Sequence, residues 1–289
     1  MKGIVLAGGT GSRLWPMTRS VSKQLLPVYD KPMIYYPIST LMLAGIREIL
    51  IITTPHEQSL FRELLGDGSD LGLVFEYATQ HEPKGLAQAY TIGEEFLSGS
   101  TSLMILGDNI FHGVGLGREL KNQFPASGGH IFTYEVSNPR DYGVLTLDSL
   151  GQPISIVEKP VHTDSNLAIT GMYFFDENVS NIAKEVAPSP RGELEITSII
   201  EAYLELQSLT FTCLSRGSVW LDTGNPNSLN DAATYIRVIE ERTGQKIACL
   251  EEISLKNGWI QASELESKFH GVNNDYSRYI TKILSLSGD

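Results

Sequence analysis

A glycine-rich stretch near the start of the chain, Leu6-Ala7-Gly8-Gly9-Thr10-Gly11-Ser12-Arg13, has residue types that suit phosphate binding. Its glycines allow a tight turn and let backbone amides approach a phosphate without obstruction. Arg13 adds a guanidinium, which suits a polyphosphate. The stretch lacks the lysine of a Walker A loop, and Leu14 stands where a dinucleotide fingerprint has its third glycine. It predicts a phosphate site of another kind, since a plain strand-to-helix turn needs fewer glycines.

Two aspartates form a second candidate site. Asp108 closes the apolar run Leu103–Leu106, and Asp222 follows the run Val219–Leu221. Two carboxylates at the ends of distant strands can hold one Mg²⁺ beside nucleotide phosphates. Either aspartate alone would more often serve a turn or a cap, so a metal site and a pair of structural aspartates are both open at this point. The six histidines show no spacing that indicates zinc.

The elements that must position these residues alternate between strand-like and helical patterns in the first half of the chain. This alternation predicts an α/β fold with a mixed, mainly parallel Rossmann-like sheet flanked by helices. Ligands of such sheets bind beyond the carboxyl ends of the strands, here the segments 8–13, 79–85 and 108–111. The expected strands are Gly3–Ala7, Glu48–Thr54, Leu73–Ala78, Ser102–Gly107 and His130–Val136, and the expected helices are Pro37–Ala44, Glu57–Leu65, Ala87–Phe96 and Val114–Phe124.

The second half of the chain is first strand-rich and then helical. Its expected strands are Gly143–Asp148, Pro153–Lys159, Ile169–Phe175 and Leu209–Leu214, with a hairpin turn at 149–151. A helical pattern begins near Asn227, and Gly244 suits its C-terminal cap. We therefore expect one main domain over residues 1–242 that includes a small strand-rich part. Residues 243–289 are expected to form a helical appendage for assembly or regulation.

The composition restricts the possible partners. The chain has 289 residues, and 22 Lys+Arg against 34 Asp+Glu give a net charge of −12. A strongly acidic protein without a run of basic residues is not expected to bind nucleic acid or an anionic membrane. No apolar run approaches the ~18 residues of a membrane span. Two cysteines outside any CxxC pair indicate a reducing compartment, so we expect a cytoplasmic protein.

Six motifs in series carry a family resemblance. The glycine-rich stretch, with Trp15, Pro16 and Lys23, resembles the signature of the sugar-1-phosphate nucleotidylyltransferases. The string from Lys23 to Pro37 is similar to the branch that uses dTTP and glucose 1-phosphate. No departure removes a catalytic group, and the motifs follow the family's order through nearly the whole chain. The other motifs are Leu106–Phe111, Tyr142–Val144, Glu158–Pro160, Gly192–Thr197 and Trp220–Gly224.

The resemblance implies a Mg²⁺-dependent transfer of a deoxythymidylyl group from dTTP to glucose 1-phosphate. The products would be dTDP-glucose, for deoxysugar and cell-surface polysaccharide biosynthesis, and pyrophosphate. The sugar phosphate would attack the α-phosphorus in line, and it needs no general base because its second pKa is near ~6. Catalysis then depends on positioning and charge neutralisation, which fits a chain without an obvious catalytic histidine. The resemblance also implies a homotetramer.

Residue roles follow from the same resemblance, position by position. Arg13 and Lys23 are expected on the triphosphate, Lys159 on the sugar phosphate, and Asp108 and Asp222 on the metal. The expected nucleotide-binding residues are Leu6, Gly8, Gly9, Thr10, Gly11, Ser12, Arg13, Gln24, Gln80, Pro83, Gly85, Leu86 and Asp108. The expected sugar-phosphate-binding residues are Asn109, Tyr142, Gly143, Glu158, Lys159, Ile169, Tyr173 and Trp220.

Base selection is expected at Gln80 and Gly85, with Leu86 against the ring. Gln80 can both donate and accept toward a pyrimidine edge, and Gly85 allows a backbone contact. The thymine methyl group is worth only about 1–3 kcal/mol in an apolar pocket. We therefore expect measurable turnover of UTP as well as dTTP.

Three other interpretations remain open at this point. The same chemistry could act on another nucleotide or sugar, although the branch-specific string favours dTTP. A catalytically silent sugar-nucleotide sensor is expected to lack Arg13, Lys23, Asp108 or Asp222, and all four are present. A dinucleotide-dependent oxidoreductase is weakened by Leu14 in the place of a glycine.

Overall fold

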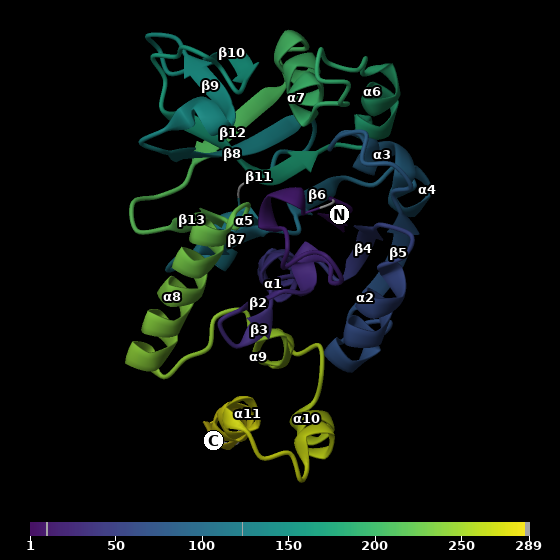
Figure 1. Ribbon diagram of the computed structural model, residues 1–289, viewed down its shortest axis with the longest axis vertical. Helices are drawn as coiled ribbons and strands as arrows, with labels where there is room; N and C mark the ends of the chain where they lie inside the picture. The colour runs from purple at the N-terminus through teal and green to yellow at the C-terminus, as the bar shows by residue number, and fades with distance from the viewer. Residues whose placement is uncertain (10, 123, 287–289) are drawn as a thin grey trace.

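The computed structural model describes residues 1–9, 11–122 and 124–286 (Figure 1). Its strands are β1 (Lys2–Ala7), β2 (Pro27–Val28), β3 (Lys31–Pro32), β4 (Glu48–Thr53), β5 (Val74–Thr79), β6 (Ser102–Leu106), β7 (Asn109–His112), β8 (Gly129–Glu135), β9 (Gly143–Leu147), β10 (Pro153–Glu158), β11 (Leu167–Phe175), β12 (Leu209–Cys213) and β13 (Val219–Asp222). Its α-helices are α1 (Tyr35–Leu43), α2 (Gln58–Leu65), α3 (Gln88–Ile92), α4 (Glu94–Leu97), α5 (Leu116–Asn122), α6 (Val179–Glu185), α7 (Ile196–Glu205), α8 (Pro226–Thr243), α9 (Leu250–Lys256), α10 (Ala262–Phe269) and α11 (Asp275–Leu286). Among these helices, none combines the length and the apolar character that crossing a membrane requires.

A mixed sheet organises the described part of the chain. Its main path runs β10-β9-β11-β6-β1-β4-β5, β8 branches from β11, and β12 pairs with β8. The pairs β6-β1, β1-β4 and β4-β5 are parallel, as the alternation of strands and helices predicts. β11 is antiparallel to β6 and extends the sheet toward the antiparallel hairpin β9-β10. The α/β fold expected from the sequence is confirmed.

Both faces of the parallel strands are buried, which explains their continuous apolar sequences. Along β1, Val5 and Ala7 face one core with α1, while Ile4 and Leu6 face a second core with α3 and α7. Alternate residues of a strand point to opposite faces, so each face needs its own cover. Polar residues are therefore placed at the strand ends, where the chain leaves the sheet.

Three details of the expected elements differ in the structure. The expected helix Ala87–Phe96 is two helices, α3 and α4, divided at Gly93. A Cβ at Gly93 would lie 3.0 Å from the Ala89 carbonyl oxygen, 3.1 Å from Leu50 and 3.3 Å from Ile4, so the chain packs tightly against the sheet there. The segment after Asp108 is a strand, β7, because it pairs with the distant β13. Helices α6 and α7 were not expected.

The C-terminal helices form a cluster of their own and also contact the body. α8 is capped by Asn225 and ends at Gly244 in a left-handed conformation, the position expected for the cap. Cys249, Leu265 and Ile280 belong to the appendage core, whereas Leu250 packs into the main core. α10 and α11 lie at the opposite end of the molecule from β9 and β10 (Figure 1).

Four charged side chains join this region to the β2-β3 hairpin. Lys31 is buried and pairs with Asp30 and, at 2.8 Å, with Glu240 of α8. Lys246 pairs with the same two carboxylates, at 3.3 Å from Glu240. The backbone amide of Ile247 also donates to Glu240, at 2.8 Å. We call Asp30, Lys31, Glu240 and Lys246 the charge ring, because each cation contacts both anions.

Candidate active site

A cavity of about 490 Å³ opens where β1 and β6 end, and it is also lined by residues of β7, β9, β10, β11 and β13. It gathers the predicted nucleotide residues and the predicted sugar residues into one space. Two predicted residues are not among its lining: Gly8 lies buried behind it, and Thr10 lies outside the described residues. The predicted residues that line it are Leu6, Gly9, Gly11, Ser12, Arg13, Gln24, Lys23, Gln80, Pro83, Gly85, Leu86, Asp108, Asn109, Tyr142, Gly143, Glu158, Lys159, Ile169, Tyr173, Trp220 and Asp222.

The described part of the glycine-rich loop places Arg13 at the cavity. Gly11 has a left-handed backbone (φ 60°), and a Cβ there would lie 2.9 Å from Cγ2 of Thr18. Both facts require glycine at this position. Residues 12–14 form a single 3₁₀ turn in which Leu14 is buried and Arg13 is exposed. Arg13 makes no ion pair with any residue that the structure describes, so its guanidinium is available to a ligand.

Lys23, Asp108 and Asp222 form the charged floor of the cavity. The Lys23 ammonium is buried and donates to Oδ2 of Asp108. Burial by itself raises the pKa of Asp108, but the Lys23 charge and hydrogen bonds from Lys23 and Asn109 outweigh it, so the pKa lies below its usual value. Burial and the Asp108 carboxylate raise the pKa of Asp222 to about 6, against the opposing charges of Lys23 and Arg13. An uncompensated acidic charge therefore lies at Asp222.

The residues present fit a magnesium site. Magnesium binds through one or two carboxylates and completes its shell with water and substrate phosphates. Asp108 and Asp222 are close enough for the charge of one to raise the pKa of the other, and both line the cavity. Within residues 1–9, 11–122 and 124–286, no three His, Cys, Asp or Glu side chains gather around one point, so a metal held entirely by protein is not indicated there.

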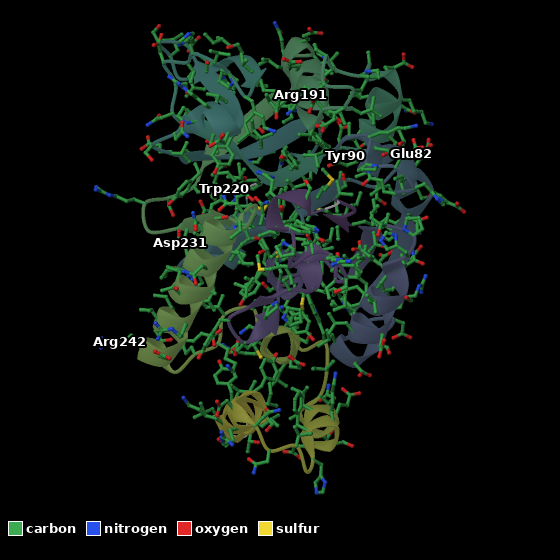
Figure 2. All side chains as sticks on the ribbon, viewed as in Figure 1. Glu82, Tyr90, Arg191, Trp220, Asp231 and Arg242 are labelled. Atoms are coloured by element: carbon green, nitrogen blue, oxygen red, sulfur yellow. The ribbon has the colours of Figure 1, made fainter. Side chains whose placement is uncertain are left out.

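Asn109 uses most of its side chain to hold its neighbours. Its Oδ1 accepts from the Trp220 indole at 2.5 Å and from the Gly171 amide at 3.2 Å. Its Nδ2 donates to Oδ1 of Asp108 at 2.9 Å. One amide hydrogen is left for a ligand. Asn109 therefore orients Asp108 and Trp220, and its predicted contact with the sugar is limited to that hydrogen. Trp220 lies where β13 leads into α8 (Figure 2).

The predicted base-binding loop around Gly85 is held in place by backbone contacts with Leu194. Gly85 has φ +121°, and a Cβ there would lie 2.3 Å from the Leu194 carbonyl oxygen. The Leu194 amide donates to the Lys84 carbonyl at 2.6 Å, and the Ala87 amide donates to the Leu194 carbonyl at 3.0 Å. Glycine is thus required at 85 by the packing of protein against protein. A contact between its backbone and a base stays a prediction.

The predicted sugar side of the cavity contains a turned backbone and a cluster of charge. Lys159 has φ 46°, and its amide donates to the Tyr142 carbonyl at 3.0 Å, so the chain turns at this residue. Nζ of Lys159 lies 3.8 Å from Oε1 of Glu158, and both residues line the cavity. Burial raises the pKa of Glu158, against the opposing charge of Lys159.

Arg191 and Glu195 also line this side of the cavity, and no role was predicted for them from the sequence. Arg191 donates to Glu195 at 2.9 Å and to Glu158 at 3.3 Å. It lies close to the start of α7 (Figure 2). One feature of the sequence could have drawn attention to Arg191. It directly precedes the motif Gly192–Thr197, to which no function was assigned. The other lining residues that were missed are Leu106, Asp141, Gly171, Glu193, Ile196, Thr197 and Gly224.

Fold and cavity together define an α/β protein that binds a nucleotide beside a second anionic substrate. Residues 2–238 match the family model described as nucleotidyl transferase, and the chain belongs to that family. Its relatives place it among the glucose-1-phosphate thymidylyltransferases. One of that name from Xanthomonas campestris pv. campestris is 52% identical over 284 residues, covering 98% of this chain and 96% of the relative. Another from Mycobacterium tuberculosis is 49% identical over 285 residues, covering 98% and 99%.

Solved structures agree with this placement. A protein from Bacillus anthracis, assigned as a glucose-1-phosphate thymidylyltransferase and solved with sucrose, superposes with a TM-score of 0.75 at 39% identity. It covers 82% of this chain and 95% of that one. A UDP-glucose pyrophosphorylase solved with UDP-glucose gives a TM-score of 0.72 at 22% identity over 82% and 98% of the two chains, and supports the fold alone. The family resemblance read from the motifs is confirmed.

Proposed function

We propose that this chain transfers a deoxythymidylyl group from dTTP to glucose 1-phosphate, with release of pyrophosphate. The observation that carries the proposal is the single cavity in which the predicted nucleotide side meets the predicted sugar side. Relatives at about half identity over nearly the whole chain bear the name of this activity. The proposal assigns each wall of the cavity to one substrate.

The proposed reaction needs charge neutralisation more than proton transfer. An oxygen of the sugar phosphate attacks the α-phosphorus of dTTP, a new P–O bond forms, and the bond to the β-phosphate oxygen breaks to release pyrophosphate. The attacking oxygen is ionised at neutral pH, so no base is required. Arg13 and Lys23 hold the triphosphate, and Lys159 holds the sugar phosphate. These cations bring two anions together within a protein of net charge −12.

Asp108 and Asp222 are the proposed ligands of a magnesium ion. When bound there, Mg²⁺ would neutralise charge on the α-phosphate. Lys23 contacts Asp108 in the structure, so it is already placed beside the position where the phosphates would lie. Asn109 holds the other oxygen of the same carboxylate and keeps it oriented.

The sugar and the base are proposed to bind at opposite ends of the cavity. Glu158 would accept from a sugar hydroxyl, with Tyr142, Tyr173 and Trp220 supplying aromatic walls. Gln80 and Leu86 would contact the base. The weak effect of the thymine methyl supports measurable turnover of UTP.

The test is pyrophosphate release with Mg²⁺, over five nucleoside triphosphates and several sugar 1-phosphates, with the product confirmed by mass. We expect the highest kcat/KM for dTTP with glucose 1-phosphate. A peak with another pair would keep the chemistry and overturn the assigned base or sugar pocket. No turnover together with retained nucleotide binding would place the chain among sugar-nucleotide sensors.

A single variant tests the assignment of the sugar wall. Lys159→Met should raise the KM for glucose 1-phosphate at least about tenfold, the effect of losing one charge-assisted contact to phosphate. The KM for dTTP should stay within about twofold. Lys184→Met is the matched control, because Lys184 is exposed, pairs with Glu94 and does not line the cavity. An equal change in both KM values would contradict the assignment.

We also propose that residues 1–242 act as the catalytic domain and that residues 243–289 serve assembly or regulation, in a homotetramer. Light scattering of the purified full chain tests the assembly, and a monomeric mass would overturn it. The substrates are a nucleotide and a sugar phosphate, so the proposal places the reaction in the cytoplasm.

A further inference from the structure

Both hydrogens on the side-chain amide nitrogen of Gln80 are donated to protein groups. It directly follows β5, its side chain is buried to 4% exposure, and it lines the cavity. Its Nε2 donates to the Gly85 carbonyl at 3.2 Å and to Oε1 of Gln88 at 2.7 Å. A side-chain amide has two hydrogens on its nitrogen, so both are used within the protein. Only the oxygen of the Gln80 amide is left for a ligand.

Gln88 determines this orientation. It belongs to the first turn of α3 and does not line the cavity. Its Oε1 accepts from Gln80 and also from the Lys84 backbone amide at 3.3 Å. The Lys84 amide can only donate, so the Gln88 atom beside it is the oxygen. The Gly85 carbonyl can only accept, so the Gln80 atom beside it is the nitrogen. If the Gln80 amide were reversed, its oxygen would face two other oxygens, those of Gly85 and Gln88.

The freed oxygen lies beside the glycine-rich loop. A Cβ at Gly8 would be only 2.3 Å from Oε1 of Gln80, so glycine at position 8 provides the space for this amide. No residue in the described part of the chain donates a hydrogen bond to that oxygen. The side chain of Gln80 is thus buried and oriented, and its oxygen is an acceptor with no donor among the described residues, in the wall assigned to the nucleotide.

We propose that Gln88 is a positioning residue that sets base specificity by holding Gln80 as a hydrogen-bond acceptor. This inference rests on the proposed function, because it takes the nucleotide to be a pyrimidine bound against Gln80. Thymine and uracil carry a hydrogen on N3, which an acceptor can bind. Cytosine has a lone pair at N3, so it would face the Gln80 oxygen without a bond. The fixed orientation of the Gln80 amide therefore disfavours CTP and does not distinguish dTTP from UTP.

The experiment measures kcat/KM for dTTP, UTP and CTP with glucose 1-phosphate in the full-length enzyme and three variants. Gln88→Met keeps the length of the side chain and removes the acceptor, and Gln88→Lys replaces the acceptor by a donor. In both, we expect the ratio of dTTP to CTP to fall about tenfold, the effect of one lost hydrogen bond. The ratio of dTTP to UTP should stay within about twofold.

Gln88→Glu is the conservative control. A carboxylate still accepts from Gln80 and from the Lys84 amide, so this variant should retain the wild-type ratio of dTTP to CTP. The quantity compared is a ratio within one preparation, so partial loss of folded protein cancels. Equal losses for all three nucleotides would show that Gln88 only supports the fold, and would overturn the proposal.

Failure of the proposed function is distinguishable from failure of this inference. A wild-type enzyme with no dTTP turnover would contradict the function. A wild-type enzyme active on dTTP, with unchanged nucleotide ratios in Gln88→Met and Gln88→Lys, would contradict the role of Gln88 alone. Loss of the ratio in Gln88→Glu as well would show that an acceptor at position 88 is not the cause.

Discussion

Two clusters of four charges, one lining the cavity and one joining the hairpin to α8, have the same composition and opposite character. The cavity holds Arg13, Lys23, Asp108 and Asp222, and the charge ring also holds two cations and two carboxylates. Lys23 and Lys31 are only eight residues apart in the sequence. The two clusters nevertheless differ in how their members are connected.

In the charge ring every cation contacts every anion. Burial by itself raises the pKa of Asp30, but hydrogen bonds from Lys246 and Lys31 outweigh it and leave the pKa below its usual value. Among Arg13, Lys23, Asp108 and Asp222, the one ion pair that the structure describes is Lys23 with Asp108, and the pKa of Asp222 is raised to about 6. Buried charges thus serve stability where their contacts are complete, and serve a ligand where they are left open.

We call Arg13, Lys23, Asp108 and Asp222 the open cluster, and the largest expected effect comes from it. Asp222→Asn should lower kcat/KM about 10³-fold, because a proposed metal ligand is lost. Its melting temperature should be unchanged or higher at pH 8, since the raised pKa means that ionised Asp222 opposes folding there. Activity assays and thermal unfolding of the same preparation check this. A large loss of stability would erase the contrast between the two clusters.

The next effect comes from the charge ring. Glu240→Gln leaves the buried Lys31 and the partly buried Lys246 with one anion, so the free energy of unfolding should fall by about 3 kcal/mol. The kcat of the folded enzyme should stay within about twofold. Urea unfolding measures the change. Glu241→Gln is the matched control, because its exposed pair with Arg237 should contribute less than about 1 kcal/mol.

The pH dependence of metal binding sharpens the contrast further. The pKa of Asp222 is raised to about 6, so the proton competes with Mg²⁺ below that pH. The half-saturating Mg²⁺ concentration should be flat above about pH 7 and rise by up to about tenfold per unit below pH 6. Titration with Mn²⁺ followed by electron paramagnetic resonance gives a readout without turnover. A flat profile down to pH 5 would speak against Asp222 as a ligand.

The smallest expected effect is at Gly224, which separates two members of the open cluster. A Cβ there would lie 3.1 Å from Oδ1 of Asp222 and 3.2 Å from Nη2 of Arg13. Gly224→Ala should displace them by tenths of an ångström and lower kcat/KM about threefold. Steady-state kinetics measure this. A loss as large as that of Asp222→Asn would mean that the spacing of these charges matters more than their presence.

The sequence predicted those parts of the molecule whose cause is local. The apolar run of β1 and the requirement for glycine at 11 follow from burial and backbone geometry, and the structure has both. The strand β7 could not be predicted, because it is short and pairs with a segment about a hundred residues later. The expected helix divides at Gly93, which packs closely on Ile4 and Leu50, residues far away in the sequence.

The predicted site residues gather around one cavity, yet the sequence could not predict how they are used. Glycine at 8 was assigned to a phosphate turn, and the structure also places the Gln80 amide against it. Asn109 was assigned to the sugar, and most of its hydrogen bonds hold protein groups. Both differences arise because a residue's partners lie far away in the sequence. Motifs identify the residues, and packing decides their partners.

Strand β11 has a mechanical consequence for substrate access. Its first residues pair with β9 on the sugar side, and its last residues pair with β6 on the nucleotide side. Between Ala168 and Met172 the strand pairs with neither of these neighbours, and Ile169 and Gly171 of this gap line the cavity. A motion that widens the cavity would therefore bend the sheet at this gap, where no ladder hydrogen bonds to β6 or β9 resist it.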